Sequence, residues 1–100
     1  MTAFNIVRMK LKPQHEEAYL KEHAARRDEG LYPGMIRMNV VKTGAHEYVV
    51  VGEWESMDAL AAARPAMITF LDGFRDKLED LGGGLGVTDP RSGEAVISAG

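Results

Sequence analysis

The stretch Val49–Leu60, VVVGEWESMDAL, holds the point where a strand pattern changes into a helix start. Its successive valines are typical of a buried strand. Ser56 is a favourable N-cap, and Asp58 places an acid in the first helical turn, where the helix dipole favours negative charge. The stretch therefore predicts a strand that ends at Trp54 and a helix that begins after Ser56.

The strand-like and the helical patterns of apolar residues also occur earlier in the chain. Alternating apolar residues predict strands, and good helix formers after Pro13, with acids early and arginines late, predict a helix. The dipeptide Gly44-Ala45 between two apolar runs is a hairpin signal. The elements expected up to Trp54 are a strand over Phe4–Leu11, a helix over Gln14–Glu29, and strands over Met35–Thr43 and His46–Trp54.

The helical pattern after Ser56 contains Pro65, which lacks a backbone N–H and is expected to break or kink the helix. A second helical segment is expected over Ala66–Leu81, because large apolar residues recur there at helical spacing. A Gly-rich strand and turn segment, residues 82–100, follows. Its expected parts are short strands at Leu85–Thr88 and Ala95–Ser98 around a turn at Asp89–Gly93.

The resulting order is β-α-β-β-α-β, and a length of 100 residues suits a single domain over residues 1–100. This order predicts an α+β protein with a ferredoxin-like βαββαβ arrangement and an antiparallel sheet. Both helices of such a unit cover one face of the sheet. The first strand is nevertheless apolar on both faces, with Val7 and Met9 on one and Phe4 and Ile6 on the other. Since a large bare apolar face is uncommon on a soluble monomer, a homodimer through the sheet face is expected.

Composition argues against several classes of function. A formal charge of -3, and the single Arg26-Arg27 pair followed by two acids, argue against a nucleic-acid partner. The absence of cysteine excludes disulfides and thiolate chemistry. No apolar run approaches the ~20 residues of a membrane span, and the first residues lack a signal-peptide pattern. A cytoplasmic protein with no membrane partner is expected, and no residue spacing suggests a metal site.

Three segments carry a resemblance to a known family: PGMIRM (33–38), VVVGEWES (49–56) and MDALAAARPAMITFLDGF (57–74). Over about residues 3–81 the chain is similar to the antibiotic biosynthesis monooxygenase family, within the dimeric α+β barrel superfamily. The resemblance implies that fold. It also implies cofactor-independent oxygenation of an electron-rich phenol, hydroquinone or polyketide-like aromatic. Because the same pattern recurs in branches with different chemistry, it implies the fold more strongly than the activity.

One branch of this family does not fit. Its haem-degrading members carry an Asn in the first strand, and a Trp and a His ligand in the helical region after the third strand. Residues 56–81 of this chain contain neither Trp nor His. Asn5 is the only counterpart, and it lies two residues from the expected position. Haem degradation is therefore not expected, and the resemblance implies no cofactor.

Trp54, the only tryptophan, admits two interpretations: it fills the core where strand meets helix, or it also walls a pocket. Gly52 precedes it on the same strand face and leaves space beside the indole, and Tyr48 continues that face. A small aromatic ligand is expected to bind between the helices and the sheet. The predicted ligand-binding residues are Asn5, Tyr19, Tyr48, Trp54 and Arg64.

His23 is the candidate catalytic base. It follows His15 and Tyr19 in a row along the first helix, but the two histidines are about 12 Å apart along the axis and cannot share a metal ion. A histidine beside an apolar cavity is a natural general base. The alternative is a partly exposed histidine bonded to a carboxylate or to water. Arg64 likewise either holds an anionic substrate oxygen or interacts with a helix C-terminus.

Two functions are consistent with these residues. In the enzyme, His23 removes a phenolic proton, Tyr48 and Trp54 stack on the ring, and Asn5 or Arg64 holds a carbonyl oxygen as negative charge grows. The alternative is a non-catalytic dimeric small-molecule-binding or stress-related accessory protein that uses the same cavity. The absence of any strong catalytic arrangement, such as a Ser/His/Asp triad, fits this alternative.

Overall fold

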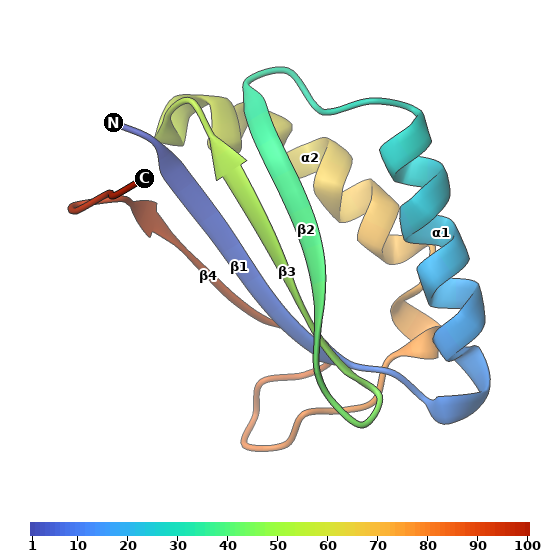
Figure 1. Cartoon of the computed structure of the whole chain (residues 1–100). Coiled ribbons are helices and arrows are strands. Elements are labelled where there is room, and N and C mark those ends of the chain that lie inside the picture. The colour runs from blue at the N-terminus through green and yellow to red at the C-terminus, as the bar shows by residue number, and fades with distance from the viewer.

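The computed structural model describes the whole chain, residues 1–100. One four-stranded antiparallel sheet carries two helices on a single face (Figure 1). This is the predicted α+β, ferredoxin-like fold. In chain order the elements are β1 (Ala3–Lys10), the 3-10 helix η1 (Pro13–His15), α1 (Glu16–Asp28), β2 (Met35–Gly44), β3 (Glu47–Trp54), α2 (Met57–Asp72), the 3-10 helix η2 (Arg75–Lys77) and β4 (Asp89–Glu94).

The strand order β2-β3-β1-β4 puts β1 and β3 at the centre of the sheet. In the antiparallel pairing of these two strands, Asn5 lies opposite Gly52. On its other side β1 pairs with β4, where Ser92 lies opposite Asn5. Three residues that are distant in sequence therefore lie side by side across the sheet.

The C-terminal segment differs from the prediction. Asp89–Gly93, expected as a turn, belongs to β4, whereas Leu85–Thr88 and Ala95–Ser98 are not strands. β4 covers an otherwise unpaired edge of β1, and satisfying the backbone groups of that edge outweighs the local turn propensity. Pro90 is tolerated because β4 is itself an edge strand.

Helix α2 begins as predicted, since the backbone N–H of Ala59 donates to Ser56 Oγ at 3.1 Å. Of the predicted break or kink at Pro65, the break was wrong, because the helix continues through this residue. Leu60 before the proline and Phe70 after it both pack into the hydrophobic core. This packing on both sides outweighs the missing backbone hydrogen bond.

The end of the second helical segment also differs from the prediction. α2 ends at Asp72 instead of Leu81, and the chain turns through η2. Leu78 is still buried, but its backbone is extended and bridges to Leu11. The spacing of the apolar residues therefore predicted correctly that Leu78 is buried, but it predicted wrongly that Leu78 is helical.

The core between helices and sheet has two parts. One cluster joins Met9 and Leu11 of the β1 region to residues of α1, of β3 and of the segment after α2; its other buried members are Tyr19, Tyr48, Phe74 and Leu78. The second cluster, at the other end of β1, comprises Ala3, Trp54, Leu60 and Ala63. None of the helices combines the length and apolar character that a membrane crossing requires.

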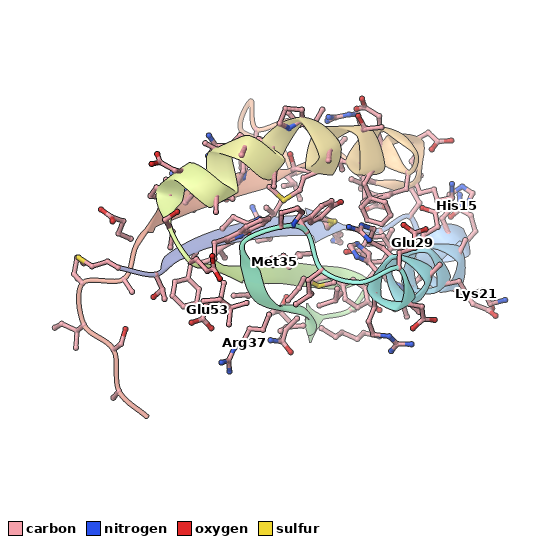
Figure 2. All side chains as sticks on the ribbon, turned by 90° about the horizontal axis from the view of Figure 1, so that it is seen from above. His15, Lys21, Glu29, Met35, Arg37 and Glu53 are labelled. Carbon is pink, nitrogen blue, oxygen red and sulfur yellow. The ribbon has the colours of Figure 1, made fainter.

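The opposite face of the sheet carries no helix (Figure 1). Ion pairs lie on it, with Arg8 3.2 Å from Glu47 and Arg37 2.9 Å from Glu53. Figure 2 shows Arg37 and Glu53 on the side of the sheet away from α2. Strand alternation places the apolar side chains of Phe4, Ile6, Val41, Val49 and Val51 on this open face.

Candidate active site

A cavity of about 500 Å³ lies between the helices and the sheet. Val7 of β1 and Val50 of β3 contribute its floor, and Met67 and Leu71 of α2 contribute a wall. Residues of α1, of the loop after α1, of β2, of the segment after α2 and of β4 also line it. The predicted location of a pocket, between helices and sheet, agrees with this cavity.

The cavity extends along β1 from Asn5 to Met9, a distance of about 13 Å for an extended strand. At the Asn5 end, Ser92 of β4 accepts a hydrogen bond from the Arg64 side chain of α2 at 3.1 Å. Toward the Met9 end, His23 packs against Tyr19 and Phe74, which belong to the buried cluster that contains Met9. The cavity is therefore long, with different chemistry at its two ends.

His23 is 8% exposed and lines the cavity. Neither of its ring nitrogens has a hydrogen-bond partner in the protein. Its ring packs edge-on against Tyr19 and Phe70, with centroids 4.6 and 5.1 Å away. Burial lowers the pKa of His23 from 6.5 to about 4, so the imidazole is neutral at pH 7.

A neutral imidazole offers one N–H donor and one acceptor nitrogen. Buried polar groups are almost always hydrogen-bonded, and an unpaired pair of nitrogens costs free energy. The alternative predicted for His23, a bond to a carboxylate or to water at the surface, does not match its burial. The arrangement instead suits a ligand whose polar group completes the hydrogen bonds of His23.

Tyr19 and Tyr48, both predicted ligand-binding residues, lie outside the cavity lining, where Tyr19 packs against His23 and Tyr48 packs against Tyr19. The Tyr19 hydroxyl donates to the sulfur of Met9 at 3.2 Å. The Tyr48 hydroxyl donates to Glu16 at 2.5 Å. Both hydroxyls are thus engaged by the protein, and burial raises the pKa of Tyr19 and of Tyr48.

Trp54 is completely buried against the helix face of the sheet and does not line the cavity. Its indole nitrogen donates to Asn5 Oδ1 at 2.7 Å. A Cβ at Gly52 would collide with that same oxygen and come within 3.0 Å of the indole nitrogen. The space expected beside the indole therefore exists, and the Asn5 amide fills it. Asn5 does line the cavity, held in one orientation by Trp54.

The sequence analysis missed a second group that supports this end of the site. Tyr32 stacks on Trp54 with ring centroids 6.2 Å apart and planes at 18°. The Arg26 guanidinium lies over the Tyr32 ring, 4.0 Å from its centroid. Tyr32 stands in a Tyr-Pro-Gly turn, so the sequence signal favoured a simple loop. Tyr32 and Arg26 both line the cavity.

The charged residues of the lining are all cationic. Five arginines contribute to it and no aspartate or glutamate does, although the whole chain has a formal charge of -3. The arginines are Arg26, Arg27, Arg64, Arg75 and Arg91. No group of three or more histidine, cysteine or acidic side chains is arranged to hold a metal ion. The chemistry available here is that of one neutral imidazole, one oriented amide, a set of guanidinium groups and the hydroxyls of Thr88 and Ser92.

Known structures share this architecture. Rv0793 from Mycobacterium tuberculosis superimposes with a TM-score of 0.79 at 14% identity, covering 100% of both chains. The NE2512 protein of Nitrosomonas europaea gives 0.76 at 15% identity, covering 98% of this chain and 92% of that one. A variant of SnoaB, a cofactor-independent oxygenase from Streptomyces nogalater, gives 0.68 at 16% identity, covering 97% of this chain and 95% of that one. At these identities the likeness concerns the fold.

No curated protein matches this chain in sequence. The sequence model of the family named Antibiotic biosynthesis monooxygenase does match, over residues 2–66. That range begins at β1 and ends in the middle of α2, so it contains Asn5, His23, Trp54 and Arg64. The chain belongs to the antibiotic biosynthesis monooxygenase family.

Proposed function

We propose that this protein is a cofactor-independent monooxygenase that acts on an electron-rich phenol or hydroquinone. The observation that carries the proposal is a largely apolar cavity that contains one buried histidine with two unpaired nitrogens. Family membership supports it, and so does the shared fold with SnoaB, a cofactor-independent oxygenase. In such a reaction one atom of O₂ is inserted into the substrate, and the other leaves as water with two hydrogens that the substrate loses, so that the substrate itself supplies all four electrons.

His23 is the proposed base. The acceptor nitrogen of the neutral imidazole takes the phenolic proton, which leaves an electron-rich phenolate that can reduce O₂. A pKa of about 4 makes the free imidazole a weak base. The phenolate formed beside it stabilises the imidazolium, because an opposite charge within a few ångströms raises the pKa of a histidine. The pair is neutral overall, and the apolar walls keep water from separating it.

Asn5 is the proposed positioning residue for a substrate oxygen. Its Oδ1 accepts from Trp54, so its amide N–H groups remain available to the cavity. An oriented donor at a site where negative charge develops contributes to the rate without having to reorganise. Trp54 acts through Asn5, since it does not line the cavity itself.

The proposal is tested by oxygen uptake with a panel of hydroquinones and anthrones in metal-free buffer. We expect uptake above the uncatalysed rate for at least one member of the panel. His23→Phe keeps the aromatic packing but removes both nitrogens, and it should lower this rate by about 100-fold or more, as loss of a general base does. His15→Phe is the matched control, because His15 directly precedes α1 and does not line the cavity.

Uptake at the uncatalysed rate across the whole panel, or equal rates for wild type and His23→Phe, would contradict the enzyme proposal. One observation favours a second function, binding without turnover. The pKa of about 4 makes His23 a weak base, and the lining contains no carboxylate that could act in its place. Saturable quenching of Trp54 fluorescence by ligands, without oxygen uptake, would identify this accessory role.

A further inference from the structure

The cavity has a charge asymmetry that the proposed reaction does not require. All its charged lining residues are arginines, in a chain with more acids than bases. Most of them are already neutralised by an acid outside the lining, as Arg75 is by Asp72 at 2.9 Å and Arg27 is by Asp28 at 3.1 Å. Arg26 and Arg91 have Glu29 and Asp89 at 3.4 and 3.6 Å.

Arg64 is the exception. It forms no ion pair, and its single side-chain hydrogen bond goes to the neutral hydroxyl of Ser92 at 3.1 Å. Arg64 and Ser92 are both solvent-exposed at the cavity, so a ligand can reach them from the surface. A guanidinium with free N–H donors binds a carboxylate in a bidentate arrangement that one partner hydroxyl does not prevent.

The position of Arg64 relative to His23 sets the shape of a ligand. Ser92 is paired with Asn5 across the sheet and bonded to Arg64, whereas His23 packs against Phe70, which follows Arg64 by six residues, about 9 Å along α2. Valine and methionine side chains line the space between these two ends. One end therefore offers a free cation, the middle is apolar, and the other end offers unpaired imidazole nitrogens.

We infer that the ligand is an elongated aromatic acid, with its hydroxyl at His23 and its carboxylate at Arg64 and Ser92. This assignment rests on the proposed function for the use of the same cavity, and it adds the charge and the orientation of the substrate. The apolar middle binds the ring system, and the carboxylate remains at the mouth, where it is still partly hydrated. Neutral phenols of the same size fit the apolar part only.

The test uses 6-hydroxy-2-naphthoate and its methyl ester, flat aromatic phenols that differ at one end by a negative charge in the acid and a methyl group in the ester. Calorimetric titration of the wild-type protein should show the acid binding about tenfold more tightly than the ester, as one charge-assisted contact at a partly exposed site provides. Arg64→Gln should reduce this preference to less than about threefold, and Arg64→Lys should retain part of it.

Arg75→Gln is the matched control, because it removes one positive charge from the same lining but from an arginine that is already paired. It should keep the preference for the acid. Equal affinities of acid and ester for wild type, no binding of either, or a preference that persists in Arg64→Gln would overturn the assignment. The measurement is of binding. A preference for the acid without oxygen uptake would therefore support this assignment and contradict only the proposed oxygenase activity.

Discussion

At the scale of single residues, Gly52 decides how the Asn5 end of the cavity is built. The Asn5 amide occupies the space above Gly52 and accepts the indole N–H of Trp54. Any side chain at position 52 displaces this amide. The buried indole nitrogen then loses its partner, which costs about 1–3 kcal/mol.

Gly52→Ala is therefore expected to lower the free energy of unfolding by about 1–3 kcal/mol, from steric overlap and a lost hydrogen bond. Urea denaturation followed by Trp54 emission measures it. Gly93→Ala is the control, because Gly93 is also a strand glycine and a Cβ there meets no atom within 4 Å. An equal loss in both variants would show that backbone propensity, and not the Asn5 contact, sets the cost.

At the scale of elements, one carboxylate connects the start of α1 to the β2–β3 hairpin. Glu16 accepts hydrogen bonds from Tyr48 and His46, both at 2.5 Å, and from Lys42 at 3.0 Å. These bonds, that of Tyr48 first, lower the pKa of Glu16 from 4.5 to about 2. The folded state therefore favours the ionised form more than the unfolded chain does.

This network predicts a pH dependence of stability. The contribution of Glu16 is complete above about pH 4.5 and is lost as the pH falls through about 2, because both states are then protonated. Glu16→Gln should lower the melting temperature at pH 7, and the difference from wild type should shrink continuously between pH 4.5 and 2. Thermal melts by circular dichroism at several pH values measure it.

Glu17→Gln is the control for this series, since Glu17 is exposed and pairs only with Lys21 on the same helix. Such a surface pair contributes little to stability. The melting temperature of Glu17→Gln should therefore follow that of wild type at every pH. A difference between wild type and Glu16→Gln that stays constant down to pH 2 would mean that the Glu16 carboxylate is not the stabilised group.

At the scale of the whole molecule, we propose that the open face of the sheet forms a homodimer interface. Ile6 and Val41 are each 43% exposed there, beside the half-buried Phe4, Val49 and Val51. The ion pairs Arg8–Glu47 and Arg37–Glu53 lie on the same face. An apolar centre with a charged rim is typical of protein interfaces, and a second copy offers a matching surface across a twofold axis.

Sedimentation equilibrium at micromolar concentration should then give about twice the chain mass of 11.0 kDa. Val51→Lys places an unpaired charge in the apolar centre and should yield monomer or aggregate. Ala62→Lys adds the same charge to an exposed position on α2 outside the cavity lining, and it should remain dimeric. A measured mass of 11.0 kDa for the wild-type protein would contradict the proposal.

The sequence alone determined the element order, the Ser56 cap, the strand faces and the general place of the cavity. Periodicity and capping depend on residues a few positions apart, so they can be read from a single chain. His23 was selected for the same reason, because it lies on the helix stripe that faces apolar residues. Arg64 was recognised as a cation, but not as an unpaired one.

The tertiary structure decided the rest. β4 replaced a predicted turn because the edge of β1 lay beside it, and α2 passed through Pro65 because both of its halves pack into the core. The unpaired nitrogens and lowered pKa of His23, and the Asn5 amide held by Trp54, also arise from contacts between distant segments. Burial and hydrogen bonding depend on which residues become neighbours on folding, and a linear pattern does not contain that information.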